Sequence, residues 1–450
     1  MAETRPQTQM RISIVGLGKL GAPIAACYAH KGHRVIGVDL NPQTIRLINE
    51  GKAPVFEPGL AELLGACRQN LVATDDYGKA IAESEVTIII VPTPSEEDGG
   101  FSLRYVIPAC ERIGEALRRK SEYHAVVITS TVLPGATEGE IKPILEASSG
   151  KGCGSGFGLC YSPEFIALGS VIRNLRSPDF LLVGEFDPRA GDFFIPTLRS
   201  ICENDPPVAR MNIVNAEITK LAVNTFVTTK ITFANMLARM CERLPGANVD
   251  IISRALGLDT RIGGKYLKGA IGYGGPCFPR DNIAMSTTAR RLGVQPTLPE
   301  ATDAANREQV ALLLEVVKSR LPSGGTVGIL GLAYKPDTDV VEESQAVKFA
   351  GALAAAGVPV ITYDPAAMGN AARALPASVK FASSVRECCR EADVIVLMTP
   401  WQEFAGVQPD DLGDARRAVV VDCWRLLDPE RFRDTAEYVA LGVGRYHARG

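Results

Sequence analysis

Three glycines stand where a short β-branched run gives way to an alanine-rich segment. The run covers residues 11–15, and Gly16, Gly18 and Gly21 follow it before a helical stretch that ends near His30. A strand that turns into a helix through glycines brings backbone N–H groups and the positive end of the helix dipole together. This arrangement suits a bound pyrophosphate and predicts a nucleotide site.

A carboxylate completes this pattern at the end of the next predicted strand. That strand covers residues 34–38 and is followed by Asp39, eighteen residues after Gly21. A carboxylate in this place accepts hydrogen bonds from ribose hydroxyls and repels the 2′-phosphate of NADP. The βαβ unit is therefore predicted to bind NAD, and the alternative is a tight turn that holds no ligand.

Strand and turn signals predict two similar halves. Further strands are predicted over 86–91 and 125–129. The same order recurs at 326–330, with a glycine turn at Gly331, a helix through Ala355, and strands over 358–363 and 393–398. Between the halves, apolar residues at helical spacing predict one long helix over 215–244.

The predicted fold is therefore α/β, with two Rossmann-like doubly wound domains joined by a long central helix. The second glycine turn lacks the full dinucleotide pattern and suits a nucleotide-linked substrate. The predicted domains are 1–214, an N-terminal NAD-binding domain; 215–320, a central helical domain with the long helix and a cysteine loop; and 321–450, a C-terminal domain that binds a nucleotide sugar.

Composition excludes several classes of partner. The 48 Lys and Arg residues are scattered and nearly balance the 51 Asp and Glu residues, so the net charge is −3 and no basic surface for nucleic acid or anionic membrane is predicted. No apolar stretch is long enough to span a bilayer, and the polar residues 1–10 lack the apolar core of a secretory signal. We expect a cytoplasmic protein with reduced cysteines and no metal site, because its four histidines form no motif.

Two polar residues share one face of the predicted long helix. Lys220 and Asn224 are four residues apart, so an ammonium and an amide could together stabilise a developing oxyanion. The alternative is a solvated helix face, which the mostly apolar neighbours make less favourable.

A glycine- and proline-rich loop presents one cysteine. Residues 272–281 read Gly-Tyr-Gly-Gly-Pro-Cys-Phe-Pro-Arg-Asp, with Asp281 one helical turn after Cys277. A thiol can add to an aldehyde, and the thiohemiacetal can lose a hydride to give a thioester. The alternative is a structural cysteine in a glycine loop.

Together these motifs resemble the UDP-glucose/GDP-mannose dehydrogenase family from about Arg11 to Asp428. The matching segments are G-L-G-K-L-G (16–21), E-P-G-L (57–60), V-P-T-P (91–94), S-T-V-L-P-G (130–135), S-P-E-F (162–165), the Lys220/Asn224 helix, G-Y-G-G-P-C-F-P-R-D (272–281) and Y-K-P-D-T-D (334–339). The resemblance implies NAD-dependent, four-electron oxidation of the C6 alcohol of a nucleoside-diphosphate hexose to a carboxylate, with two NAD consumed.

The resemblance also implies roles for individual residues. Cys277 is the expected nucleophile, Lys220 and Asn224 stabilise the oxyanion, Asp281 and Thr131 hold a water, and Glu164 is the base for thioester hydrolysis. The residues expected to bind the cofactor are Gly16, Gly18, Lys19, Leu20, Gly21, Asp39, Pro92, Thr93, Ser130 and Thr131. Those expected to bind the substrate are Glu164, Phe165, Lys220, Asn224, Arg261, Tyr266, Lys268, Tyr273, Gly274 and Lys335. Arg261 resembles an arginine lent by a neighbouring subunit, and a homodimer or larger homo-oligomer is implied.

The sequence departs from the family pattern at two places. Leu168 stands where many UDP-glucose enzymes have a second glutamate, and Glu342 stands where the family usually has an arginine before Glu-Ser. We expect Glu342 to point to solvent rather than to the cofactor phosphates.

Several functions remain as alternatives. An NDP-glucose (UDP-glucose or dTDP-glucose) is favoured as substrate, and a UDP-N-acetylhexosamine is the alternative sugar. A β-hydroxyacid dehydrogenase would also carry a Lys-xxx-Asn pair on a long helix but would perform two-electron chemistry. A non-catalytic sensor of NAD or sugar nucleotides is the third possibility. The presence together of Lys220, Asn224, Cys277 and Asp281 argues against it.

Overall fold

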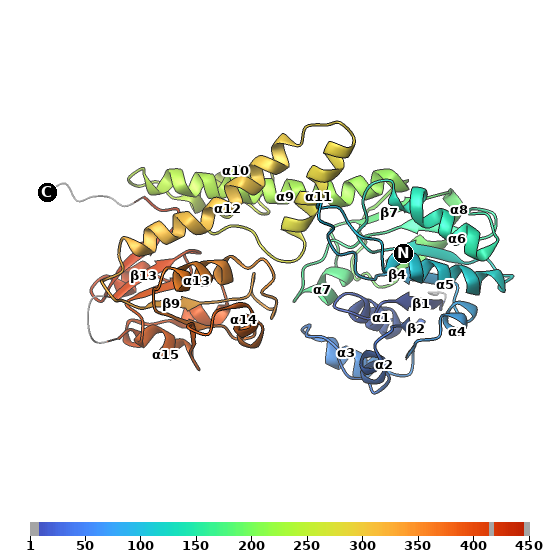
Figure 1. Cartoon of the computed structure of the whole chain (residues 1–450), viewed down its shortest axis with the longest axis horizontal. Coiled ribbons are helices and arrows are strands. Elements are labelled where there is room, and N and C mark those ends of the chain that lie inside the picture. The colour runs from blue at the N-terminus through green and yellow to red at the C-terminus, as the bar shows by residue number, and fades with distance from the viewer. Residues whose placement is uncertain (1–8, 414–417, 445–450) are drawn as a thin grey trace, which may run out of the picture. The chain divides into compact units, whose positions relative to one another are not determined.

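The computed structural model describes residues 9–413 and 418–444 of the chain. This chain divides into two compact units, Met1–Ala222 and Val223–Gly450, which Figure 1 colours from blue to green and from green to red. Residues 1–8, part of the polar segment that argues against a signal, lie outside the described ranges. The three predicted domain ranges are not tested by this division and stay a prediction.

The first unit is built on an eight-stranded sheet of order β3-β2-β1-β4-β5-β6-β7-β8, parallel except at the β6–β7 pair. Its strands are β1 Arg11–Val15, β2 Arg34–Val38, β3 Leu71–Thr74, β4 Val86–Ile89, β5 Ala125–Ile128, β6 Gly158–Tyr161, β7 Leu181–Glu185 and β8 Val208–Asn212. Its helices are α1 Gly21–His30, α2 Pro42–Asn49, α3 Leu60–Cys67, α4 Tyr77–Ala82, α5 Val106–Arg118, the π-helical turn η1 Thr137–Ile141, α6 Lys142–Ser149, α7 Val171–Arg176 and α8 Pro188–Arg199.

The second unit contains a six-stranded parallel sheet of order β11-β10-β9-β12-β13-β14. Its strands are β9 Val327–Leu330, β10 Val360–Tyr363, β11 Lys380–Phe381, β12 Val394–Leu397, β13 Ala418–Asp422 and β14 Ala436–Ala440. Its helices are α10 Val249–Leu258, α11 Phe278–Arg291, α12 Thr297–Lys318, α13 Gln345–Ala355, α14 Met368–Ala374 and α15 Val385–Arg390, with short 3-10 turns at Gln402–Gly406, Pro409–Asp411 and Pro429–Phe432.

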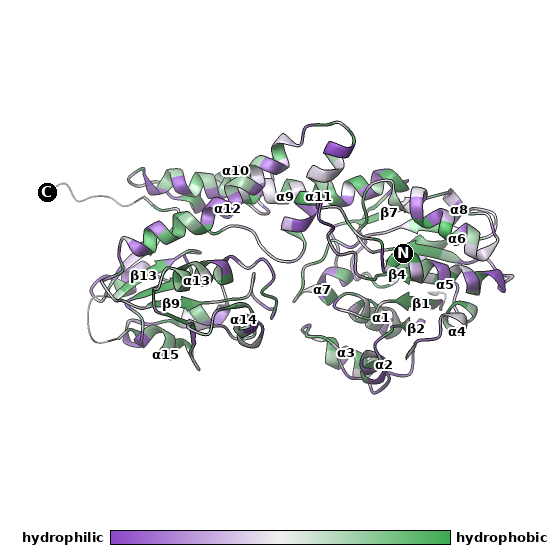
Figure 2. Ribbon diagram, viewed as in Figure 1, coloured by the Kyte–Doolittle hydropathy of each residue, from purple (hydrophilic) through white to green (hydrophobic). Residues whose placement is uncertain are grey.

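Burial explains why the central strands are continuous apolar runs. All residues of β4, β5, β9, β12 and β13 are buried, which is expected for parallel strands covered on both faces by helices. The strands of both sheets accordingly appear hydrophobic in Figure 2. The long helix α9, Ile213–Glu242, begins directly after β8 and continues across the boundary between the units. The predicted α/β fold with two doubly wound sheets and a long central helix is confirmed.

One predicted element is wrong in its start. The sequence pattern predicts a helix that begins directly after the glycine turn at Gly331, whereas α13 begins only at Gln345. Residues 332–344 form an irregular segment in which Asp337 and Glu343 adopt positive φ angles of 63° and 52°. The Ser344 hydroxyl accepts a hydrogen bond from the Val347 N–H, so the helix starts at this cap.

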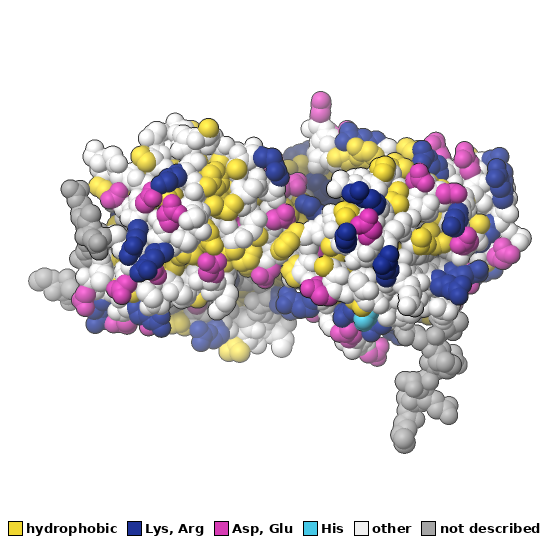
Figure 3. All heavy atoms as spheres, turned by 90° about the horizontal axis from the view of Figure 1, so that it is seen from below, with side chains coloured by type: hydrophobic (Ala, Val, Ile, Leu, Met, Phe, Trp, Pro, Cys, Tyr) yellow, Lys and Arg dark blue, Asp and Glu magenta, His cyan; other side chains and the backbone are white. Residues whose placement is uncertain are grey.

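The surface charges, the helices and the cysteines bear on the expected partners and compartment. On the face drawn in Figure 3, Lys and Arg side chains are interspersed with Asp and Glu. Among the described residues, none of the helices is both long and apolar enough to cross a bilayer. Of the eleven cysteines, eight are buried, Cys153 and Cys202 are partly buried, and Cys277 is exposed. The cytoplasmic location and the absence of a nucleic-acid partner stay predictions.

Candidate active site

The glycine turn after β1 has the geometry of a nucleotide site. Gly16 has a φ of +96°, and a Cβ there would lie 2.6 Å from the Ile90 carbonyl oxygen. A Cβ at Gly21 would lie 1.8 Å from the Gly16 carbonyl oxygen. Gly18 is exposed, and a Cβ there would meet no atom within 4 Å. Packing therefore requires Gly16 and Gly21, whereas Gly18 leaves open space where a ligand can approach the backbone.

Asp39 lies directly beside this turn, as predicted. Its two carboxylate oxygens accept hydrogen bonds from the Leu17 N–H at 2.7 Å and the Asn41 N–H at 2.8 Å. Each oxygen has a further lone pair and can still accept a bond from a ribose hydroxyl. The open cradle at Gly18 and this carboxylate together fit the adenosine diphosphate portion of NAD.

The two loops that follow β4 and β5 are tied to each other. The buried Thr93 hydroxyl donates to the Thr131 carbonyl oxygen at 2.8 Å, and the Ser130 hydroxyl donates to the Val91 carbonyl oxygen at 2.7 Å. The structure therefore brings together the predicted cofactor residues of these two motifs, at the carboxyl edge of the sheet where Rossmann-like domains bind ligands.

A buried carboxylate of α9 anchors the loop that contains Thr131. Glu217 is fully buried and accepts hydrogen bonds from the Gly135 N–H at 2.6 Å and the Thr137 N–H at 2.9 Å. Burial raises the pKa of Glu217, and these N–H donors oppose the rise. Sequence reasoning missed this residue, because its partners lie about eighty positions earlier in the chain.

Glu164 and Lys220 lie together in the first unit. The buried Lys220 ammonium donates a 2.7 Å hydrogen bond to the Glu164 carbonyl oxygen and lies 4.9 Å from the centre of the Phe165 ring. Burial raises the pKa of the Glu164 carboxyl to about 7, although the Lys220 charge opposes this shift. A carboxyl with such a pKa can exchange a proton near neutral pH, which suits a general base.

Glu57 gives the E-P-G-L motif a structural role that the sequence analysis did not assign. Its buried carboxylate accepts 2.7 Å hydrogen bonds from the N–H groups of Gly169 and Val171, and so holds the segment that follows Glu164. Leu168 is partly buried and packs against the apolar core of the first unit. This packing suits the apolar side chain of Leu168.

In the second unit, Asn224 and Asp281 form a buried pair beside the cysteine loop. The Asn224 amide donates to Asp281 Oδ2 at 2.6 Å, and these residues are 8% and 1% exposed. Cys277 is the residue that precedes the first turn of α11, and its carbonyl oxygen accepts the Asp281 N–H at 2.8 Å. The exposed thiol of Cys277 therefore lies at the N-terminus of α11.

The other predicted substrate residues of the second unit occupy several different environments. Arg261 is exposed and pairs with Asp259 of its own chain, Tyr266 and Lys268 are exposed, and Tyr266 has a φ of 65°. Tyr273 and Gly274 are buried in the cysteine loop, and Lys335 is partly buried with its ammonium 3.4 Å from the Pro336 carbonyl oxygen. The rings of Tyr266 and Tyr273 both pack edge-on against the ring of Phe278.

Glu342 has an exposed side chain, as the sequence analysis favoured. Its carbonyl oxygen accepts the Gly275 N–H at 3.1 Å, so the backbone of this residue contacts the cysteine loop. Among the described residues, no group of three or more His, Cys, Asp or Glu side chains is arranged so that it could hold a metal ion.

The glycine turn and the adjacent Asp39 place the protein in the class that binds NAD on a Rossmann-like domain. Comparison with known families makes the assignment specific. Three models of the UDP-glucose/GDP-mannose dehydrogenase family match the chain: the NAD binding domain at residues 10–201, the central domain at 214–308 and the UDP binding domain at 328–429. The chain belongs to this family and is an NAD-dependent nucleotide-sugar 6-dehydrogenase.

Individual relatives agree with this assignment. The chain is 36% identical over 422 residues to the UDP-glucose 6-dehydrogenase AglM of Haloferax volcanii, covering 93% of this chain and 97% of the relative. It is 36% identical to the GDP-mannose 6-dehydrogenase of Pseudomonas aeruginosa, covering 79% of this chain and 81% of the relative. A UDP-glucose dehydrogenase structure from Pyrobaculum islandicum matches with a TM-score of 0.87 and 33% identity over 98% of this chain and all of that one. The β-hydroxyacid and sensor alternatives are therefore set aside.

Proposed function

We propose that this enzyme oxidises UDP-glucose to the uronic acid in two NAD-dependent steps. The observation that carries the proposal is the exposed Cys277 thiol at the N-terminus of α11, next to the buried Asn224–Asp281 pair. A two-electron dehydrogenase needs no such nucleophile, whereas oxidation beyond the aldehyde benefits from a covalent thioester.

The proposed roles of the chain's residues follow from their chemistry. Gly16, Gly18, Gly21 and Asp39 would hold NAD, which would supply the hydride acceptor for oxidation of the sugar carbon. Lys220, whose ammonium has donors beyond the one given to the Glu164 carbonyl, stabilises the oxyanion at C6 together with Asn224. Cys277 adds to the aldehyde, its thiohemiacetal loses a second hydride to become a thioester, and a water held by Thr131 and Asp281 hydrolyses it.

Glu164 is the proposed base in the hydrolytic step. It takes a proton from the attacking water as the carbon–sulfur bond breaks, and the departing thiolate remains on Cys277. The pKa of about 7 given to this carboxyl by burial allows both protonation states near neutral pH. The resulting balance is two hydrides transferred, one water consumed and one carboxylate formed.

UDP-glucose is proposed because relatives that cover at least 90% of the chain are named for it and the C-terminal model is that of a UDP binding domain. GDP-mannose is the second candidate, supported by relatives of 36–37% identity over about four fifths of the chain. The sequence analysis favoured dTDP-glucose alongside UDP-glucose, and none of these relatives is named for dTDP-glucose. NADH formation measured with UDP-glucose, GDP-mannose, dTDP-glucose and UDP-N-acetylmannosamine tests the proposal, and a higher kcat/KM for any sugar other than UDP-glucose would contradict it.

We also propose that the enzyme is a homodimer or larger homo-oligomer. Phe226, Phe233 and Met240 recur every seven residues on α9 with exposed fractions of 64%, 45% and 52%, and Ile251 and Leu258 of α10 are 62% and 82% exposed. A second copy would remove this apolar stripe from water. Arg261 would then be available to a partner's substrate. Light scattering of Phe233→Glu should show a smaller assembly than the unmodified enzyme, and an unchanged mass would contradict this interface.

A further inference from the structure

Seven residues, 269–275, form a buried strap that includes the first four residues of the cysteine loop. All of them except Ile271 are buried, and Cys277 follows the strap after a single proline. The strap has no strand neighbour in either sheet. Its backbone groups are instead hydrogen-bonded by side chains and loops of other elements.

Two asparagines bond the strap from the helical side. Asn235 of α9 accepts the Ala270 N–H at 2.8 Å and donates to the Ile271 carbonyl oxygen at 3.0 Å. Asn306 of α12 accepts the Tyr273 N–H at 2.8 Å and donates to the Tyr273 carbonyl oxygen at 3.0 Å. Both asparagines are buried, so these amides replace the hydrogen bonds that a sheet would supply.

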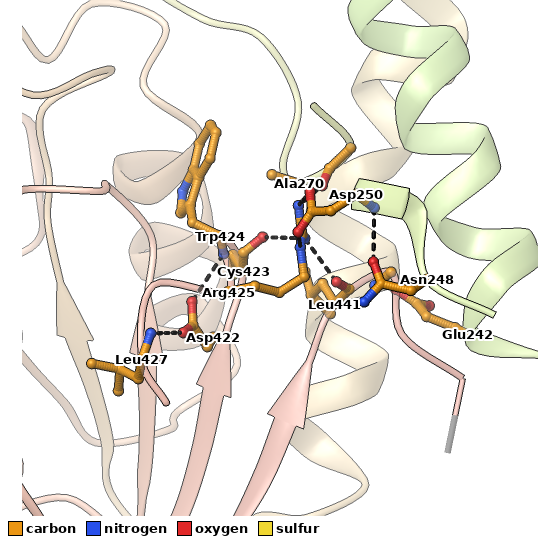
Figure 4. Close-up of polar contacts among 12 residues, drawn as sticks. Glu242, Asn248, Asp250, Ala270, Asp422, Cys423, Trp424, Arg425, Leu427 and Leu441 are labelled. Atoms are coloured by element: carbon orange, nitrogen blue, oxygen red, sulfur yellow. Dashed lines mark hydrogen bonds and ion pairs between the residues drawn. The ribbon is translucent and has the colours of Figure 1, made fainter. Parts of the chain in front are cut away.

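Segments of the C-terminal half bond the same strap at three points. The Arg425 guanidinium, only 8% exposed, donates to the Gly269 carbonyl oxygen at 2.7 Å and pairs with Asp250 at the start of α10 (Figure 4). The Gln345 amide donates to the Tyr273 carbonyl oxygen at 2.8 Å. The Gly275 N–H donates to the Glu342 carbonyl oxygen at 3.1 Å.

The glycines of the strap are required by this close packing. A Cβ at Gly272 would lie 2.5 Å from Asn306 Oδ1 and 3.0 Å from Gln345 Oε1. A Cβ at Gly274 would lie 2.4 Å from the Glu343 carbonyl oxygen. A Cβ at Gly275 would lie 2.5 Å from the Tyr334 ring. Residues 334–345 therefore lie directly against the strap, and a shift of this segment would move the strap with it.

We propose that the C-terminal nucleotide-sugar domain positions Cys277 through this strap, with Gln345 and Arg425 as positioning residues. The inference rests on the proposed role of Cys277 as the nucleophile. Misplacement of a reacting group by about 1 Å can lower a rate about a hundredfold, so a loosened strap should slow turnover. The glycine turn and Asp39 lie in the other unit, so NAD binding should not depend on the strap.

Gln345→Met tests the proposal, because it retains side-chain length and removes the N–H donated to the Tyr273 carbonyl oxygen. Asn70→Leu is the matched control, since it removes one amide donated to a backbone carbonyl, that of Ala29, in the first unit. Steady-state kinetics and hydrogen–deuterium exchange of the peptide 269–278 are measured for both full-length enzymes. Arg425→Lys, which retains the charge but not the guanidinium fork, serves as a second variant if Gln345→Met does not fold.

Gln345→Met should lower kcat at least tenfold, leave the KM for NAD within twofold, and speed exchange of the strap amides at least threefold. Asn70→Leu should leave all three within twofold. Faster exchange with an unchanged kcat would overturn the positioning role, and unchanged exchange would show that Gln345 does not hold the strap. The exchange measurement does not depend on cysteine chemistry. A fully active Cys277→Ser enzyme would refute the nucleophile role of Cys277, whereas unchanged exchange in Gln345→Met would refute the role of Gln345 in the strap, so the two failures are distinguishable.

Discussion

The Asn224 amide donates a 2.6 Å hydrogen bond to the carboxylate of Asp281, and both side chains are almost completely buried. The two residues are fifty-seven positions apart, one on α9 and the other in the first turn of α11. Both belong to the second unit, so one half of the candidate active site is already assembled there.

Asn224→Asp should destabilise the enzyme by about 2–4 kcal/mol at pH 8, because it places a second carboxylate within hydrogen-bond distance of buried Asp281. Asn224→Ala should cost less, about 1–3 kcal/mol, because it removes one hydrogen-bond donor from a carboxylate that keeps its 3.6 Å ion pair with Arg280. Denaturant unfolding at pH 8 and pH 5 measures both. The Asp variant should recover part of its loss at pH 5, where one carboxyl of the pair can bind a proton, and equal losses at both pH values would contradict this explanation.

Glu164 predicts a pH dependence in two separate measurements. Burial raises the pKa of this carboxyl to about 7, so the fraction of ionised base, and with it the hydrolytic step, should increase about tenfold between pH 6 and pH 8. A carboxyl whose pKa is higher in the folded state than in the unfolded state stabilises the folded state most below its ordinary pKa of about 4.5. This stabilisation is lost as the pH rises through 7. Glu164→Gln should therefore gain stability relative to the unmodified enzyme between pH 5 and pH 8.

A pH–rate profile with no ionisation near pH 7, or a Glu164→Gln enzyme with the same profile, would show that Glu164 is not the base. Thermal unfolding of both proteins across the same pH range provides the second measurement.

Asp39 should confer a strong preference for NAD over NADP, since its carboxylate repels a 2′-phosphate. Asp39→Asn is the sharper variant, because its side-chain oxygen can still accept one of the two bonds from Leu17 and Asn41. Asp39→Asn should lower the ratio of kcat/KM with NAD to kcat/KM with NADP at least tenfold. Equal kcat/KM for the two cofactors in the unmodified enzyme would show that Asp39 does not face the ribose.

Glu342→Arg should leave NAD affinity nearly unchanged, within about 0.5 kcal/mol, because the Glu342 side chain is exposed and only its backbone contacts the cysteine loop. If Glu342 faced the cofactor phosphates, Glu342→Arg would instead tighten NAD binding by about 1–3 kcal/mol, and this gain would fall at high salt. NAD titrations at low and high salt separate the two cases.

Local sequence patterns predicted a large part of this molecule. The β-branched strands, the glycine turn with Asp39 and the long helix all depend on neighbours within about thirty residues, so their patterns are visible in the chain. The same holds for Cys277 and Asp281, which are separated by one helical turn.

The anchoring residues were not predictable in this way. Glu57 binds the backbone of Gly169 and Val171, and Gln345 binds the backbone of Tyr273. Almost every residue type carries the same backbone N–H and C=O groups. The residue types at these positions therefore do not reveal that a distant side chain bonds their backbone. The late start of α13 was missed for a related reason, because the irregular segment before Ser344 is held by its packing against the strap glycines.

The central claim is that Cys277 holds the sugar covalently, as a thiohemiacetal before the second oxidation and as a thioester after it. The most direct measurement is the amount of NADH formed per nucleotide sugar by the unmodified enzyme and by Cys277→Ser. The account predicts two NADH per sugar for the unmodified enzyme and a fall in turnover of at least a hundredfold for Cys277→Ser, since serine is the weaker nucleophile and its ester hydrolyses less readily. Steady turnover of Cys277→Ser at the unmodified rate, with two NADH per sugar, would contradict it.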